Sequence, residues 1–220
     1  MFLGHFAAAF AAKKADKTVS LGTTILAAQW LDLLWPVLLL TGTEKAAIAA
    51  PGSAVPLEFT SYPVTHSLLA VAGWAVLFGV IFFFLTKNSR GAWLVGILVI
   101  SHWVLDWLVH IPDLPLTPFS GFKTGMGLWN YKLPELAIEL LMFAGGVYLY
   151  MQNRTFISKK KNLIMWSLVI FLLVVHIMNT FGEAPPSISA VAVVGLSQWL
   201  LVAWGYWADP AKRQIQVLAT

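Results

Sequence analysis

Long apolar segments alternate with short polar ones along almost the whole chain. A helix rises about 1.5 Å per residue, so about 20 mostly apolar residues are needed to cross a bilayer. Six segments reach that length: about 19–42, 66–86, 91–111, 134–152, 162–182 and 187–208. The pattern predicts an all-α fold, a polytopic membrane helix bundle of about six transmembrane helices.

The first apolar stretch, Phe2 to Ala12, is too short to be a further span. Even the first 12 residues of the chain, as a helix, would reach only about 18 Å. Lys13 and Lys14 follow this stretch, which is the reverse of the order in a cleavable signal peptide. We expect either an interfacial helix lying flat on the membrane or a re-entrant half-helix inside the bundle, where surrounding protein satisfies the backbone.

The composition supports a membrane protein and leaves little room for a soluble domain. Apolar residues make up 59% and charged residues 11% of the chain, and the mean hydropathy is +0.76. Soluble domains carry roughly 25% charged residues. We therefore expect a single transmembrane domain over residues 1–220. The sequence contains no cysteine, which excludes disulfides and thiolate metal sites.

Basic residues gather on one side of the predicted spans. When the connections are assigned to alternate sides, 11 Lys and Arg residues fall on the side of both termini and 3 on the other. The larger group includes Arg154, Lys212 and Arg213. The positive-inside rule then places both termini in the cytoplasm. Because these short loops explain the net charge of +4, we expect no nucleic-acid partner.

Several ionisable residues interrupt the apolar segments. A charged side chain at the centre of a membrane helix costs about 3 kcal/mol or more unless it is paired. Asp32 lies in the middle of the first span, and His102, Asp106 and His110 recur at intervals of four in the third. That spacing places the three on one helical face, which Asp113 extends. We expect this face to point into the bundle.

Other candidate residues lie on other segments. His5 is in the N-terminal stretch, His66 begins the second span and His176 lies in the fifth, while Glu135 and Glu139 are four residues apart on the fourth. Imidazole and carboxylate together suit Zn, Mn or Fe. A divalent cation with an open coordination position activates water for hydrolysis, and a spare carboxylate can transfer a proton or orient a ligand.

Each pattern also has a structural alternative. Asp32 could pair with a lysine or a tryptophan N–H, and the stripe of histidine and aspartate could be a proton or ion path or a purely structural network. His176 is typical of a hydrogen bond between helices. Glu135 and Glu139 begin a helix, where carboxylates interact favourably with the helix dipole.

Four short motifs, in this order, resemble the bacterial membrane-bound metal-dependent hydrolases: Gly4-His5, Asp32 followed by Pro36, Thr65-His66-Ser67, and His102 with Asp106. That family looks distantly similar to zinc-dependent phospholipase C enzymes in ligand order. The resemblance covers roughly the first 115 residues. It implies five metal ligands: His5, Asp32, His66, His102 and Asp106. The family often has a DxD pattern at the first aspartate, whereas Asp32 has leucine on both sides, so a single metal or a degenerate site is an alternative to two metals.

Together these observations predict a membrane-embedded metal-dependent hydrolase of a bacterial inner membrane. The cofactor would be a divalent metal, Zn first, with Mn and Fe as alternatives. His110, Glu135 and Glu139 would be the catalytic residues, and the substrate a lipid-linked or amphipathic ester or phosphoester. The alternatives are a proton- or cation-conducting carrier or channel subunit, and a non-catalytic subunit of an oligomer or larger membrane complex. The sequence shows no repeat and no broken spanning helix, which disfavours a carrier.

Overall fold

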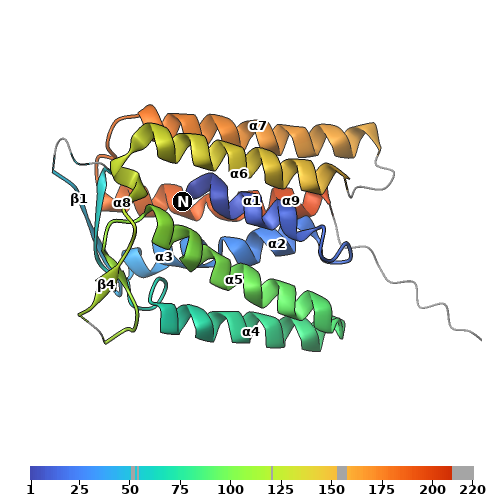
Figure 1. Cartoon of the computed structure of the whole chain (residues 1–220), viewed down its shortest axis with the longest axis horizontal. Coiled ribbons are helices and arrows are strands. Elements are labelled where there is room, and N and C mark those ends of the chain that lie inside the picture. The colour runs from blue at the N-terminus through green and yellow to red at the C-terminus, as the bar shows by residue number, and fades with distance from the viewer. Residues whose placement is uncertain (51–52, 54, 120, 153–157, 210–220) are drawn as a thin grey trace, which may run out of the picture.

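The computed structural model describes residues 1–50, 53, 55–119, 121–152 and 158–209, and these form one helical bundle (Figure 1). The longest helices are α4 (Leu68–Thr86), α5 (Ser89–Val109), α6 (Lys132–Gln152) and α7 (Lys159–Phe181). With the continuous stretch Ile188–Ala208, made of α8 (Ile188–Leu196) and α9 (Gln198–Ala208), five helical segments are long and apolar enough to cross a membrane among the described residues. The predicted all-α membrane bundle is confirmed.

Much of the apolar surface of these helices faces outward. In the most apolar helix, α4, only 11% of the residues of its spanning window are buried within the protein. Large side chains such as Phe84, Leu85 and Trp93 are exposed. A helix that is apolar on all sides but buried on few of them is typical of contact with lipid.

The first predicted span is broken, contrary to the prediction from the sequence. Helices α2 (Leu21–Ala28) and α3 (Trp30–Leu40) meet at an angle of 54° at Gln29, and they complete six spans when taken as one. The expectation of unbroken spans was wrong. Neither glycine nor proline stands at the break, so the sequence contains no local signal for it. Pro36 lies farther along α3. At the bend, the Ala28 carbonyl accepts a hydrogen bond from the His102 side chain.

The N-terminal helix α1 (Phe2–Ala12) enters the bundle and does not lie flat on its surface. It packs along α6 and also contacts α2 and α5 (Figure 1). Leu3, Phe6 and Phe10 are fully buried. The backbones of α1 and α6 approach closely at Gly146, where an added Cβ would lie 2.4 Å from the carbonyl oxygen of Ala7. Of the two predicted placements, the half-helix inside the bundle is correct.

Two small hairpins cover one end of the bundle (Figure 1). Strand β1 (Lys45–Ile48) pairs with β2 (Leu57–Ser61), and β3 (Leu114–Pro115) pairs with β4 (Lys123–Thr124), both antiparallel. A short 3₁₀ helix, η1 (Leu128–Asn130), leads into α6. The α1–α2 and α4–α5 connections lie at the opposite end. Three basic residues used to predict orientation lie outside the described residues: Arg154, Lys212 and Arg213. The cytoplasmic placement of the termini stays a prediction.

One buried carboxylate joins two of the connections at the end opposite the hairpins. Asp16 accepts hydrogen bonds from the N–H and hydroxyl of Thr18, at 2.8 and 2.6 Å, and from the Asn88 amide at 2.7 Å. Asn88 in turn caps α5 through the N–H of Gly91 at 3.0 Å. Burial opposes the ionised form of Asp16, but these hydrogen bonds outweigh it and lower its pKa.

Replacing Asp16 with alanine should lower the free energy of unfolding by about 2 kcal/mol, because hydrogen bonds to a charged group are lost. Since the pKa of Asp16 is lowered in the folded state, its stabilisation is complete above the ordinary value of 3.8 and is lost as the pH falls below it. Thermal unfolding in detergent at neutral pH measures the effect. The exposed Lys14→Ala variant is the control, and equal melting temperatures would contradict the role of Asp16.

Candidate metal centre

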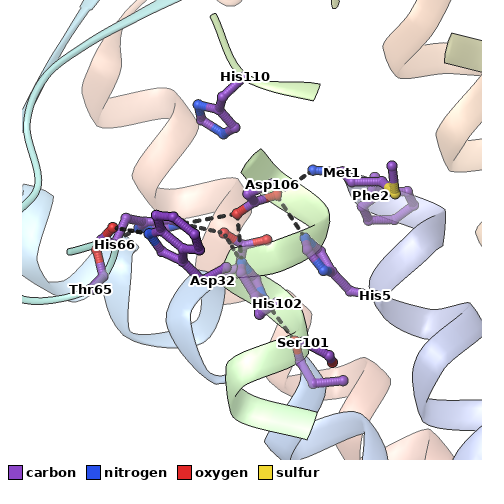
Figure 2. Close-up of polar contacts among 12 residues, drawn as sticks. Met1, Phe2, His5, Asp32, Thr65, His66, Ser101, His102, Asp106 and His110 are labelled. Atoms are coloured by element: carbon purple, nitrogen blue, oxygen red, sulfur yellow. Dashed lines mark hydrogen bonds and ion pairs between the residues drawn. The ribbon is translucent and has the colours of Figure 1, made fainter. Parts of the chain in front are cut away.

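Five imidazole and carboxylate side chains meet inside the bundle (Figure 2). They come from α1, α3, the segment before α4, and α5: His5, Asp32, His66, His102 and Asp106. The sequence separates these residues by up to about a hundred positions, and their convergence depends on α1 entering the bundle. All five residues of the predicted ligand set are therefore brought together.

Asp106 lies at the centre of the cluster. Its Oδ1 is 3.1 Å from His5 Nε2, and its Oδ2 is 3.1 Å from His102 Nε2 and 3.6 Å from His66 Nε2. Asp32 Oδ1 lies 3.6 Å from Nε2 of both His66 and His102. In two groups of three, the candidate ligand atoms all lie within 4.8 Å of one another: His5, Asp32 and His102, and His66, His102 and Asp106.

The cluster is buried, with one partly accessible member. His5, His66, His102 and Asp106 are all buried. The side chain of Asp32 keeps 29% of its surface exposed. A small molecule would therefore reach the cluster from the side of Asp32.

The tautomer of His102 follows from its backbone partner. His102 Nδ1 lies 2.7 Å from the carbonyl oxygen of Ala28, at the break between α2 and α3. A carbonyl oxygen only accepts hydrogen bonds, so Nδ1 is the protonated donor. In a neutral ring, Nε2 then has its lone pair directed at Asp32 and Asp106. This nitrogen has no hydrogen-bond partner within the described part of the chain.

The tautomer of His66 is set by two residues that lie outside the cluster. Thr65 Oγ1 donates to Glu44 Oε2 at 2.6 Å, and a hydroxyl has only one hydrogen to donate. Its 2.7 Å contact with His66 Nδ1 must therefore be a hydrogen bond donated by the imidazole. Glu44 is held in turn by the N–H groups of Val64 and Thr65, at 2.8 and 2.9 Å. His66 Nε2 is left facing the two aspartates.

Glu44 was not predicted as a functional residue from the sequence, and Thr65 was predicted only as part of the motif around His66. Glu44 lies in a polar connection 21 residues before Thr65, so no local spacing relates the two. Metal-binding histidines usually donate their other ring N–H to a carbonyl, a carboxylate or water. His102 donates to the Ala28 carbonyl, and His66 donates to a hydroxyl that is itself bound to the Glu44 carboxylate, so both rings have an outer partner that fits a ligand.

The first turn of α1 brings two further polar contacts to the cluster. His5 stacks on His102, with ring centres 3.6 Å apart and planes 6° from parallel. The amino group of Met1 donates to Asp106 Oδ1 at 2.6 Å. A positive group thus lies directly against the central carboxylate.

His110 lies apart from the five-residue cluster, although the helical spacing placed it on the same stripe (Figure 2). It follows the last residue of α5 with an extended backbone, and its ring centre is 6.5 Å from that of His66. Its Nδ1 lies 2.8 Å from Asp113 Oδ1, which also accepts the Tyr62 hydroxyl at 3.0 Å. Burial lowers the pKa of His110. Burial and the Asp113 carboxylate raise the pKa of Tyr62.

Glu135, Glu139 and His176 form a separate group between α6 and α7. Glu139 accepts the N–H groups of Phe2 and Gly4 at 3.2 and 3.1 Å, which satisfies two donors at the start of α1 that have no partner within the helix. The Glu139 carboxylate therefore interacts with the N-terminus of α1. Within the described residues, it does not interact with the N-terminus of its own helix, α6, as the sequence had suggested. The ring of His176 does not form the expected interhelical bond through Nε2, which has no partner among the described residues.

Comparison with known proteins places the chain in one family. A family model described as the YdjM inner membrane protein matches residues 2–184, a range that contains the whole cluster and ends between α7 and α8. The description names an inner membrane protein and no activity. Comparisons with curated proteins and with solved structures gave no significant match.

Replacing Thr65 with valine should weaken binding of Zn²⁺ to the purified protein by about 10- to 100-fold, the usual effect of removing an outer hydrogen-bond partner of a ligand. Valine keeps the shape of threonine but removes the hydroxyl between Glu44 and His66. Competition with a fluorescent zinc chelator measures the affinity. Thr60→Val removes an exposed hydroxyl on β2 and is the matched control. Equal zinc affinity in the two variants would show that Thr65 does not orient His66.

Proposed function

We propose that this chain, which belongs to the YdjM inner membrane protein family, is a metal-dependent hydrolase embedded in the bilayer. One observation carries the proposal: the Nε2 atoms of His66 and His102 both face the carboxylates of Asp32 and Asp106. The Nδ1 atoms of both histidines are engaged as donors. In the neutral rings, the Nε2 lone pairs therefore face carboxylate oxygens, which are also acceptors. A cation between them would resolve this arrangement.

The donor set fits a divalent metal. His5, Asp32, His66, His102 and Asp106 would hold it, three imidazoles and two carboxylates without thiolate, which suits Zn, with Mn and Fe as alternatives. The unpaired Nε2 of His102 and the outer hydrogen bonds of His66 and His102 support this fit. When bound, the metal would supply Lewis-acid activation of the ester or phosphoester and of water.

His110 is the residue best placed to transfer a proton. Asp113 engages its Nδ1 at 2.8 Å, which leaves Nε2 to exchange a proton with a reacting group. The Trp129 ring, whose centre is 4.0 Å away, and the nearby Tyr62 restrict its orientation. Because its pKa is lowered by burial, His110 is neutral near pH 7 and can accept a proton.

Glu139 would contribute by positioning. Its two oxygens hold the backbone of Phe2 and Gly4, and His5 follows directly. This carboxylate thus keeps the first turn of α1, and with it one imidazole, against Asp106. Glu135 lies one turn earlier on α6 and lines a neighbouring cavity.

The location of the cluster indicates an amphipathic substrate. The candidate ligands lie in a bundle whose outer surface is apolar, and only Asp32 among them is partly accessible. A molecule with an ester or phosphoester bond and a lipid anchor would reach this depth without leaving the membrane. A freely soluble substrate would have to enter between apolar helices.

A proton or cation carrier is the second candidate, favoured by the break at Gln29. Many transporters have discontinuous helices near their binding sites. In this chain the break also exposes the carbonyl that orients His102, so it serves the hydrolase equally well. A proton flux in proteoliposomes, without turnover of any lipid ester, would favour the carrier.

The double variant His102→Ala, Asp106→Ala should lose both bound metal and hydrolysis, because it removes the central carboxylate and the imidazole shared by both ligand groups. Elemental analysis of purified protein should find about one metal per wild-type chain and almost none in the double variant. Activity on a panel of lipid esters and phosphoesters should fall with the metal. The exposed Glu58→Ala variant is the control. Equal, near-zero metal in wild type and double variant would refute the hydrolase.

Replacing His110 with glutamine should lower kcat by about 100-fold or more while bound metal is unchanged, because general acid–base catalysis contributes about 10²–10⁴-fold. Steady-state kinetics and elemental analysis of the same preparation separate the two effects. Loss of metal would instead identify His110 as a ligand. An unchanged kcat would remove it from proton transfer.

A further inference from the structure

A second polar site lines a cavity of about 670 Å³ at the hairpin end of the bundle. The cavity lies between α6, α7 and the β1–β2 hairpin, and Phe2 of α1 forms part of its wall. Its volume is within the usual range for small-molecule sites, about 300–1,000 Å³. It is a separate place from the five-residue cluster, none of whose members lines it.

The lining of this cavity combines polar and aromatic groups. The polar groups come from α6 and α7: Glu135, Glu139, His176, Asn179 and Thr180. The aromatic rings are Phe2, Phe59 and Trp129. Residues four apart on α6 and three or four apart on α7 lie on single helical faces. The two helices therefore present a polar seam to a cavity that aromatic rings also line.

The polar seam has a surplus of hydrogen-bond acceptors. His176 is only 3% exposed, and its Nε2 has no hydrogen-bond partner among the described residues. Its ring is stacked 11° from parallel on Phe2, with centres 6.2 Å apart. Buried polar atoms are normally hydrogen-bonded, so this nitrogen indicates a ligand. Glu139 adds a carboxylate whose two oxygens accept the N–H groups of Phe2 and Gly4 and still have further lone pairs, and Glu135 lies one turn away on α6.

The cavity contains one lysine, which does not neutralise this surplus. The Nζ of Lys132 lies 4.8 Å from the ring centre of Phe181, a residue outside the cavity wall. Its ammonium is therefore held over a neighbouring ring. The His176 imidazole, Glu135 and the lone pairs of Glu139 that the α1 backbone does not use are left to a ligand that brings its own N–H donors and positive charge.

We propose that this cavity binds the primary ammonium of an amphipathic lipid headgroup. A primary ammonium has three N–H donors for the carboxylates and the imidazole, and Phe59 and Trp129 offer the aromatic faces that attract cations. That this lipid is the substrate rests on the proposed function. Phe2 lines the cavity, and His5, in the same first turn of α1, contacts Asp106 at 3.1 Å. An ammonium bound here directs the adjoining phosphoester toward the candidate metal ligands.

Native mass spectrometry of the metal-free protein in detergent tests this assignment. Titrated dihexanoyl phosphatidylethanolamine should bind about tenfold or more tightly than the matching phosphatidylcholine, which has the same charge but no N–H donors. Phosphatidylglycerol, which has no amine, should also bind weakly. Glu135→Gln should reduce the preference for the primary amine about tenfold, and Asn179→Leu should weaken binding. Glu58→Gln on β2, outside the cavity, should bind like wild type.

Equal binding of the ethanolamine and choline lipids would overturn the proposal. The proposal would also be overturned if Glu135→Gln and Asn179→Leu both kept the full preference for the ethanolamine lipid over the choline lipid. Both variants must elute as monodisperse protein for this comparison. The second arm of the experiment uses ethanolamine phosphate, which has no acyl chains. If it binds as tightly as the lipid, recognition of the ammonium is supported, but the proposal that the ammonium belongs to a lipid is overturned. Because binding is measured without metal, intact binding with no hydrolysis would refute only the proposed function. Hydrolysis without amine preference would refute only this inference.

Discussion

An ionised carboxylate in an apolar bundle is stable only when donors or positive groups surround it. Asp106 is the residue on which this constraint acts most strongly here. It is almost fully buried; the Met1 amino group donates to its Oδ1 at 2.6 Å, and His5 Nε2 lies 3.1 Å from the same oxygen. The helices therefore cannot be arranged by apolar packing alone, since any arrangement must also supply partners for this side chain.

This requirement accounts for two irregular features of the bundle. Helix α1 enters among the spanning helices and delivers His5 to Asp106, and Glu139 satisfies the backbone donors at the start of that helix. The break at Gln29 presents the Ala28 carbonyl to His102. Each irregularity leaves backbone groups without a partner in their own helix, and a polar side chain compensates in each case. Glu139 binds the N–H groups at the start of α1, and His102 binds the Ala28 carbonyl at the break.

The candidate metal centre and the proposed ammonium site lie on two sides of the first turn of α1. His5 reaches the cluster, while Phe2 forms a wall of the cavity. Glu139 belongs to both, because it lines the cavity and binds the backbone of Phe2 and Gly4. A headgroup bound in the cavity would thus contact the same turn that positions a metal ligand. This arrangement would couple recognition of the proposed lipid to the proposed chemistry of the site.

The sequence by itself determined the spanning segments and the residues that do not suit lipid, because hydropathy and helical spacing are local properties. It also identified the five members of the cluster, through short motifs and the resemblance that they support. Only the tertiary structure decided how these residues are held. Glu44 orients His66 through Thr65, Glu139 caps a helix 135 residues away, and His110 turns to Asp113. The break at Gln29 has no local signal either. Hydrogen-bond partners depend on which distant segments meet, and no local pattern contains that information.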